Sequence, residues 1–166
     1  MLTKTFLHTV FLCLGTNLGD KQSNLDLAIA HIVKHCGEVK GQSGVYKSEA
    51  WGYESENDFY NQCLKIETHF TPDQLIDILL SIERDMGRPG ASTTYADRMM
   101  DIDVLFFDDM DIQTGRLVVP HPRIAERRFV LAPMTELAPD LVHPVIKKSM
   151  RVLLEECEDE GEVRKI

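Results

Sequence analysis

The stretch that decides the fold is RMMDIDVLFF, residues 98–107, in which two acids stand inside an apolar run. Its composition predicts a β-strand, on which successive side chains point to opposite faces. Because apolar residues follow on both faces, the strand is expected to be buried. Strict alternation places Met100, Ile102, Val104 and Phe106 on one face, and Asp101, Asp103, Leu105 and Phe107 on the other.

The two acids of this strand, Asp101 and Asp103, therefore share a face, about 7 Å apart at Cα from the rise of a strand. Like charges beside a core repel each other and lose hydration unless a cation or a proton compensates them. In one interpretation the start of the strand still lies in solvent. In the other, the pair supplies oxygen ligands to a hard cation such as Mg²⁺. From this stretch alone the two interpretations carry equal weight.

The segments around this strand show the periodicities of an α+β protein. The spacing predicts strands at 10–14, 39–48 and 59–70, with Gly41 and Gly44 weakening the second or marking a bulge, and helices from Asp20 to Gly37 and from Thr71 to Gly87. The order strand, helix, strand, strand, helix, strand is the ferredoxin-like βαββαβ arrangement.

Further elements are expected after the acidic strand. They are a hairpin at 111–119, a helical stretch after 120–123, a C-terminal helix near 146–157 and a tail, 155–166, that frays as a solvated helix end. We therefore predict an α+β fold with a ferredoxin-like core, an added hairpin and C-terminal helices. A length of 166 residues suits one domain spanning 1–166.

Composition narrows the function classes. The chain is 43% apolar and 27% charged, as in ordinary globular proteins, and its net charge of −9 argues against a nucleic-acid binder. No apolar run reaches the length of a membrane span, and residues 4–15 resemble a signal peptide only faintly. The four cysteines form no CxxC pair, which favours free thiols in a reducing cytoplasm.

Basic residues point to an anion near the acidic strand. Arg88 and Arg98 bracket a loop of small residues, and guanidinium groups facing a metal pair would neutralise a polyphosphate. Downstream, residues 118–129 add His121, Arg123 and Arg127. The alternative is that the arginines simply lie in solvent and that the histidine has a structural role. The chain has no GxxxxGK[ST] motif, so a nucleotide would be bound without a P-loop.

Two further residues have a functional and a structural interpretation. Glu83 lies in the last turn of its helix, where an acid is mildly unfavourable, but solvent exposure or pairing with a neighbouring arginine is the favoured explanation. Phe59 and Asn61 share a strand face, where an amide beside an aromatic ring can bind a flat heterocycle. A core ring with an edge amide is the alternative.

Several motifs in order resemble one family. LGTNLGD, FYN, the segment from Glu83 to Arg88, RMMDIDVLFF and VPHPR…ERRFVLAPMTELAPDLVHP, between about residues 10 and 145, are similar to the 6-hydroxymethyl-7,8-dihydropterin pyrophosphokinases of folate biosynthesis. The chain departs from the family pattern at Tyr95, at Asp97 and in EAWG, residues 49–52. The resemblance implies a ferredoxin-like fold. It also implies transfer of the terminal diphosphate of ATP to the hydroxymethyl group of the pterin, which leaves AMP.

The resemblance also implies residue roles. Asp101 and Asp103 would bind two Mg²⁺ ions, and Arg88 and Arg98 would close over the phosphates. The implied ATP site consists of Glu83, Ile76, Val104, Arg116, Leu117, His121 and Arg127. The implied pterin site consists of Ser48, Trp51, Gly52, Phe59, Asn61 and Phe129. The expected partners are these two small molecules, without nucleic acid or membrane, and a monomer is one expectation for the assembly.

Two other functions remain open from the sequence. A nucleotidyltransferase or cyclase also places acids on a ferredoxin-like sheet for two metals, but it would release pyrophosphate rather than AMP. A regulatory module would bind ligand without turnover and would not need both acids.

Overall fold

The computed structural model describes residues 6–87 and 95–166, and its centre is an antiparallel sheet. The strand order is β5-β1-β4-β3-β8, with β2 also pairing with β4. The strands of this sheet are β1 (His8–Thr16), β2 (Glu38–Gln42), β3 (Tyr46–Ser48), β4 (Phe59–Thr68), β5 (Asp101–Phe107) and β8 (Val163–Lys165).

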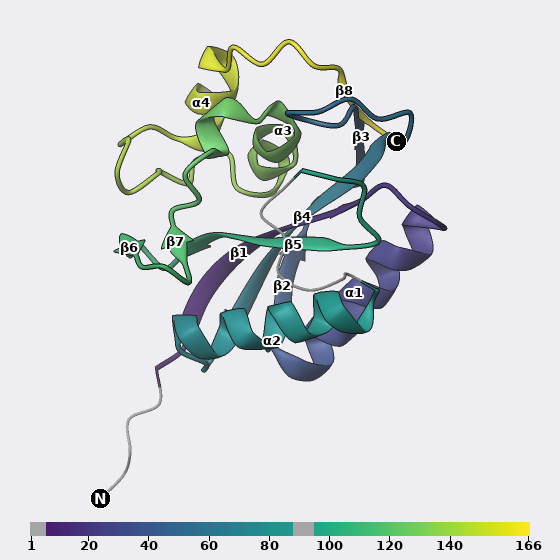
Figure 1. Ribbon diagram of the computed structural model, residues 1–166. Helices are drawn as coiled ribbons and strands as arrows, with labels where there is room; N and C mark the ends of the chain where they lie inside the picture. Colours follow the sequence, from purple (N-terminus) through teal and green to yellow (C-terminus); the bar gives the residue numbers. More distant parts are fainter. Residues whose placement is uncertain (1–5, 88–94) are drawn as a thin grey trace, which may run out of the picture.

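Helices cover both faces of the sheet (Figure 1). Helices α1 (Lys21–His35) and α2 (Pro72–Asp85) pack on one face, and α3 (Arg128–Leu137) and α4 (Met150–Glu156) pack on the other. A 3₁₀ turn, η1 (Ile124–Glu126), precedes α3, and a separate hairpin joins β6 (Ile112–Gln113) to β7 (Val118–Val119). No helix in the described ranges is long and apolar enough to cross a membrane.

The predicted βαββαβ order is confirmed, and so are the added hairpin and the C-terminal helices. The second predicted strand is divided into β2 and β3, which both pair with β4. A register shift between Val39 and Gly41 marks the expected irregularity. Between the two pieces, Ser43 continues the pairing, since its N–H donates to the Cys63 carbonyl at 2.9 Å.

Helix α2 begins where its capping signal predicts. The Thr71 hydroxyl accepts from the Gln74 N–H, and the Gln74 side chain accepts from the Thr71 N–H. The helix buries Leu75, Leu79 and Ile82 against the sheet. This packing fixes the rotation of α2 and holds Glu83, in its last turn, beside β5.

The alternation predicted along β5 is wrong at its end. Phe11 pairs with Phe106 but Leu12 pairs with Val104, so Leu105 is the extra residue of a β-bulge. Past the bulge the faces exchange: Phe106 joins the cluster under α3 and α4, and Phe107 joins the cluster under α1 and α2. The bulge lies after Asp101 and Asp103, so these two acids keep the shared face that the sequence predicts.

The prediction for the tail is also wrong. Helix α4 ends at Glu156, and residues 163–165 return as β8, which pairs with β3 at the sheet edge. The Ile166 N–H extends this pairing to the Val45 carbonyl at 2.9 Å. Strand β8 is short and mostly exposed, so its sequence carries no alternation of apolar and polar residues by which it could be found.

Candidate active site

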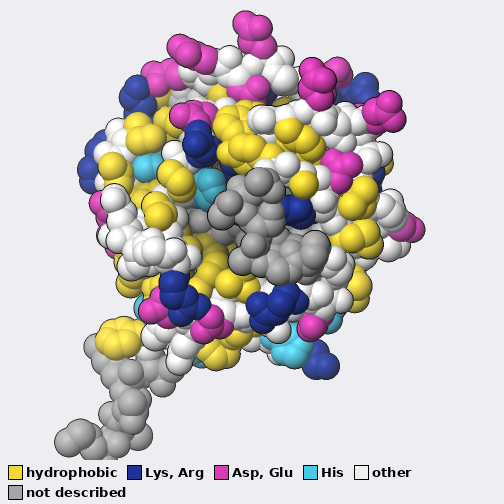
Figure 2. Space-filling model, in the orientation of Figure 1, with side chains coloured by type: hydrophobic (Ala, Val, Ile, Leu, Met, Phe, Trp, Pro, Cys, Tyr) yellow, Lys and Arg dark blue, Asp and Glu magenta, His cyan; other side chains and the backbone are white. Residues whose placement is uncertain are grey.

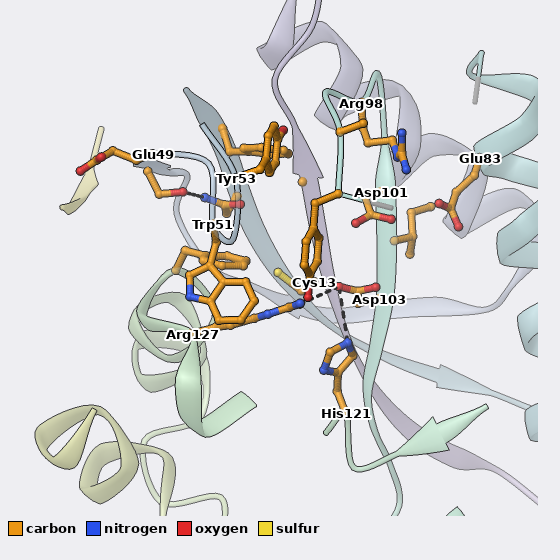
Figure 3. Close-up of a pocket in the computed structure, with 18 of the residues that line it drawn as sticks. Cys13, Glu49, Trp51, Tyr53, Glu83, Arg98, Asp101, Asp103, His121 and Arg127 are labelled. Carbon is orange, nitrogen blue, oxygen red and sulfur yellow. Dashed lines mark hydrogen bonds and ion pairs between the residues drawn. The ribbon is translucent and has the colours of Figure 1, made fainter. Parts of the chain in front are cut away.

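A cavity of about 310 Å³ lies at one end of strands β1, β4 and β5 (Figure 3). Its walls come from α2, from residues 49–53, from residues 95–98 and from the segment 121–129. The predicted site residues that line it are Ser48, Trp51, Phe59, Asn61, Ile76, Glu83, Arg98, Asp101, Asp103, His121, Arg127 and Phe129. One cavity therefore brings together most of the residues chosen from the sequence for both substrates.

The two acids of β5 lie side by side in this cavity, and each is partly buried. Their cross-strand partners on β1 are Gly15 and Cys13, whose small side chains leave the space above them open. Asp103 Oδ2 lies 3.7 Å from Arg127 Nη1 and 3.9 Å from His121 Nε2. Figure 3 shows these three side chains converging, while Asp101 lies just above Asp103 with Arg98 and Glu83 near it.

The pair fits a magnesium site of the kind that binds substrate phosphates. Carboxylate oxygens are the ligands that Mg²⁺ prefers, and the ion commonly keeps only one or two of them beside phosphate and water oxygens. The described part of the chain contains no group of three or more His, Cys, Asp or Glu that could hold a metal. Asp101 and Asp103 would therefore leave most of the coordination shell to substrate oxygens and water.

His121 is neutral at pH 7. Burial, which is the largest cause, and the nearby Arg127 and Arg123 guanidiniums together lower its pKa from 6.5 to about 4. Its Nδ1 accepts a hydrogen bond from the Arg123 N–H at 3.2 Å, so the proton is assigned to Nε2, which faces Asp103. With a neutral ring, the 3.9 Å contact to Asp103 is not an ion pair. Nε2–H is then a donor directed into the cavity.

This pKa predicts an acid-dependent loss of stability. The folded-state pKa lies below the ordinary value, so the unfolded state binds more protons between pH 6.5 and 4, and stability falls as the pH falls through that window. At about 1.4 kcal/mol per pKa unit, a difference of about 2.5 units gives a loss of at most about 3.5 kcal/mol. Urea unfolding at pH 7 and pH 4 should show the parent losing more stability than His121→Gln. The exposed His35→Gln is the control, and identical losses in the parent and His121→Gln would contradict the assignment.

Arg127 is held between aromatic rings. Its guanidinium carbon lies 4.7 Å from the centroid of the Trp51 ring and 5.6 Å from that of Phe129. The side chain is almost fully buried, and its Nε finds no hydrogen-bond acceptor among the described residues. A buried donor without an acceptor is costly, which suits a group that receives an anionic ligand oxygen.

The other end of the cavity is built around Asn61, which is buried in the middle of the sheet rather than at its edge. Its Nδ2 donates to Ser48 Oγ at 2.8 Å and to the Tyr46 carbonyl at 3.3 Å, which fixes the amide orientation. A Cβ on Gly15 would lie 3.5 Å from Asn61 Oδ1 and 3.6 Å from the Phe59 ring. The glycine therefore leaves the amide and the ring accessible from the cavity.

The remaining predicted residues lie outside the lining. Gly52, with a φ of +80°, brings its backbone against the Tyr95 ring at the rim. Val104 and Leu117 are buried in the cluster under α1 and α2, and Arg116 is exposed and pairs with Asp77. Arg88 lies outside the described residues. The roles of these residues in substrate binding stay predictions.

Solvent exposure, one of the two favoured explanations for Glu83, is wrong, while its pairing with a neighbouring arginine stays a prediction. Glu83 is only 3% exposed and lines the cavity from α2. Four further residues have no role predicted from the sequence: Tyr53 and Tyr95, which line the cavity, and Asn17 and Asp97, which lie outside its lining. The sequence carries one signal for two of these residues, because Tyr95 and Asp97 both depart from the family pattern.

The surface charge is uneven (Figure 2). Acidic side chains gather along the upper edge, where α4 and the segment after it lie, and residues 155–162 contain six acids. Lysine and arginine side chains are scattered over the rest of this face, at its margins as well as nearer its centre. The described lining of the cavity is itself rich in acids, since Glu49, Glu83, Asp101 and Asp103 accompany the arginines Arg98 and Arg127.

Comparison with known proteins gives one family. The model of the family "7,8-dihydro-6-hydroxymethylpterin-pyrophosphokinase (HPPK)" matches residues 11–139. A 2-amino-4-hydroxy-6-hydroxymethyldihydropteridine pyrophosphokinase of Aquifex aeolicus is 36% identical over 143 residues, covering 86% of this chain and 88% of that protein. The Bacillus subtilis protein of the same name is 36% identical over 131 residues, covering 78% of each.

Solved structures agree on the fold. A Plasmodium falciparum HPPK-DHPS, solved with pterin and p-hydroxybenzoate, superposes with a TM-score of 0.74 over 94% of this chain, at 16% identity. This chain spans 42% of that protein. At this identity the likeness concerns the fold, and it confirms the ferredoxin-like architecture.

Proposed function

The chain belongs to the 7,8-dihydro-6-hydroxymethylpterin-pyrophosphokinase family, and we propose that its reaction takes place in the cavity between β5, α2 and the segment 121–129. The enzyme is a diphosphokinase of folate biosynthesis with ATP as co-substrate. It transfers the terminal diphosphate of ATP to the hydroxymethyl oxygen of 6-hydroxymethyl-7,8-dihydropterin and releases AMP. The observation that carries the assignment of the site is that Asp101 and Asp103 share one cavity with the buried amide of Asn61.

The pterin is proposed to bind at the Asn61 end. A fixed amide can exchange a pair of hydrogen bonds with the edge of a flat heterocycle, and here Ser48 holds that amide in place. The rings of Phe59, Phe129 and Trp51 also line the cavity and supply stacking surfaces. Gly52 brings the rim of the cavity close to Tyr95.

The triphosphate is proposed to lie along β5. Asp101 and Asp103 would hold two Mg²⁺ ions, which when bound polarise the phosphate oxygens and the attacking hydroxyl. Arg98 and Arg127 neutralise charge that spreads over the phosphoryl oxygens, and neutral His121 donates from Nε2. The proposed ATP site also includes Arg88, Glu83, Ile76, Val104, Arg116 and Leu117.

The reaction requires no dedicated base among these residues. Phosphoryl-type transfer proceeds through a loose transition state, so positioning and charge neutralisation account for most of the acceleration. The cavity provides both, since one end fixes the acceptor and the other fixes the donor. What the chain contributes is therefore the relative placement of the two substrates.

A product assay tests this proposal. ATP should be converted to AMP only when 6-hydroxymethyl-7,8-dihydropterin and Mg²⁺ are both present, with formation of the pterin diphosphate. Release of free pyrophosphate would instead indicate a nucleotidyltransferase or cyclase. Binding of both ligands without AMP formation would indicate a regulatory module, and either result would overturn the proposal.

Trp51 provides a specific test of the pterin end. Trp51→Ala should weaken pterin binding by about 1–2 kcal/mol, the scale of an aromatic contact and its buried area, while ATP affinity stays nearly unchanged. As the only tryptophan, Trp51 should also change its emission more with pterin, Mg²⁺ and a non-hydrolysable ATP analogue than with the analogue alone.

The readouts are a fluorescence titration of the parent, corrected for pterin absorption, and calorimetric titration of both proteins. Because Trp51 packs on Arg127 at 4.7 Å, Arg127 could also respond to the substitution. Trp51→Phe, which keeps a ring, is therefore the matched control. Unchanged pterin affinity in Trp51→Ala, or emission that responds only to nucleotide, would contradict the role.

We further infer the setting of the enzyme. Residues 1–166 act as a single pyrophosphokinase domain, and the protein is a monomer. The four cysteines are free thiols, which supports a cytoplasmic location. Gel filtration with light scattering and fractionation of cells would test these two points.

A further inference from the structure

Asp97 is the centre of a hydrogen-bond cluster behind the cavity. Its Oδ1 accepts from Asn17 Nδ2 and the Tyr53 hydroxyl, both at 2.9 Å, and from Ser55 Oγ at 2.8 Å. Its Oδ2 accepts from Asn57 Nδ2 at 2.8 Å. Hydrogen bonds from Asn57, Ser55 and Asn17 lower the pKa of this carboxyl to about 2. Four donors on one carboxylate are charge-assisted bonds, which are stronger than neutral ones.

These donors belong to two segments that are distant in sequence. Tyr53, Ser55 and Asn57 lie in the rim loop, residues 49–58, which carries Trp51 on the proposed pterin side. Asn17 follows β1. Asp97 itself precedes the proposed phosphate-binding Arg98. One side chain thus joins the turn after β1, the rim loop and the segment that leads into β5.

Asn17 extends the cluster to the backbone of Arg98. The Arg98 N–H donates to Asn17 Oδ1 at 2.7 Å, and the Asn17 N–H donates to the Arg98 carbonyl at 3.0 Å. Asn17 Nδ2 also donates to the Asn57 carbonyl at 3.1 Å. Asn17 is 1% exposed, so its bonds cannot be replaced easily by water. The backbone of Arg98 is therefore fixed by a residue that Asp97 and the rim loop hold.

Ring contacts join the same two segments on the cavity side. The Trp51 and Tyr95 rings meet edge to face with centroids 5.9 Å apart. A Cβ on Gly52 would lie only 3.1 Å from the Tyr95 ring, so the rim loop and Tyr95 are in close contact. The hydrogen bonds of Asp97 and the ring contacts of Tyr95 thus hold residues 95–98 against the rim loop from two sides.

We propose that Asp97 is a positioning residue that couples pterin binding at the rim loop to the placement of Arg98 on the phosphates. The inference rests on the proposed function. Asp97 does not line the cavity and touches neither substrate in this account. It acts by keeping the rim loop and Arg98 in one arrangement, so that order gained by the loop on binding pterin is passed to Arg98. Loss of the cluster would let the two segments move separately, and a misplacement of about 1 Å can cost about a hundredfold in rate.

The test compares Asp97→Ala with Asp108→Asn. Asp108 lies at the other end of β5 and also accepts two hydrogen bonds, from His8 Nδ1 and from the Thr9 N–H. Asp97→Ala should lower kcat by about 30-fold to 100-fold and raise the pterin KM several-fold, because Arg98 and the rim loop would no longer be held in place. The ATP Kd without pterin should stay within about twofold, since the loss is in placement and not in ATP contacts. Asp108→Asn should change none of these.

A double-mutant cycle separates positioning from a general structural role. If Asp97 acts through Arg98, Asp97→Ala should lower kcat far less in an Arg98→Ala background than in the parent. Asp97→Asn keeps an acceptor for the three donors at Oδ1 and should restore most of the activity. Additive losses in the cycle, or an Asp97→Ala protein with a lower Tm but parental kcat and pterin KM, would overturn the proposal.

Two further measurements test the proposal when Asp97→Ala does not fold or when turnover cannot be measured. If Asp97→Ala does not fold, Ser55→Ala and Asn57→Ala each remove one bond to Asp97 and should show the same pattern at smaller size. Ser55→Ala also removes the acceptor of the Asn57 N–H. Amide hydrogen exchange at residues 52–57 and 95–98 should accelerate in Asp97→Ala and not in Asp108→Asn, and this readout needs no turnover. A parent that makes no AMP refutes the proposed function, whereas unchanged exchange refutes the coupling through Asp97.

Discussion

Asp103→Ala is expected to abolish turnover while the protein stays folded. Removing one metal ligand should cost several kcal/mol of transition-state stabilisation, on the order of a 10³-fold loss in rate or more. The fold should persist because Asp103 is partly exposed at the cavity and packs in neither hydrophobic cluster. AMP formation at saturating substrates measures the loss, with circular dichroism and Tm confirming the fold.

The structure supplies two controls for Asp103. Asp109→Ala removes an exposed carboxylate from the turn that follows the same strand and should leave turnover unchanged. Asp103→Asn keeps the shape but removes the charge that faces Arg127 at 3.7 Å, so it should also be severely impaired. Near-parental turnover in a folded Asp103→Ala protein would contradict the proposal that Asp103 is a metal ligand.

Arg98→Ala should lower kcat by about 10²-fold to 10³-fold, the scale for losing one group that stabilises developing charge on phosphoryl oxygens. ATP binding without pterin should weaken much less, because the proposed contact is made mainly in the reacting state. Figure 3 shows Arg98 beside Asp101, where the phosphates are proposed to lie. Single-turnover kinetics and calorimetric ATP titration measure the two quantities separately.

Arg98→Lys and Arg151→Ala complete this experiment. Lysine keeps the charge but loses the planar fork of donors, so partial activity is expected. Arg151 is exposed on α4, where it pairs with Asp140, and its loss should leave kcat unchanged. Weaker ATP binding with a parental kcat in Arg98→Ala would show that Arg98 contributes only ground-state binding.

Local sequence signals account for the parts of the fold that were predicted correctly. The cap at Thr71 and Gln74 fixes the start of α2 because both hydrogen bonds form within one turn. The shared face of Asp101 and Asp103 follows from strand geometry alone. Both kinds of signal depend on neighbours in sequence and need no knowledge of the sheet.

The features that were predicted wrongly, or not predicted, depend on contacts between residues far apart in the sequence. The bulge at Leu105 arises from the pairing of β5 with β1, about 90 residues earlier, so the exchange of Phe106 and Phe107 has no local signal. The cluster at Asp97 assembles donors from residues 17 and 53–57, and its members are ordinary loop residues in the sequence. The burial of Glu83 likewise follows from the placement of α2 against β5.

The strand order also has a consequence for synthesis on the ribosome. Strand β1 is made first, but its partners β4 and β5 end at residues 68 and 107. At roughly 5–20 residues per second, the nascent chain carries this apolar strand with an unpaired edge for about 5–20 s until β5 is complete. Residues 10–14, all fully or nearly buried in the folded protein, are the segment that chaperones would have to shield during that interval.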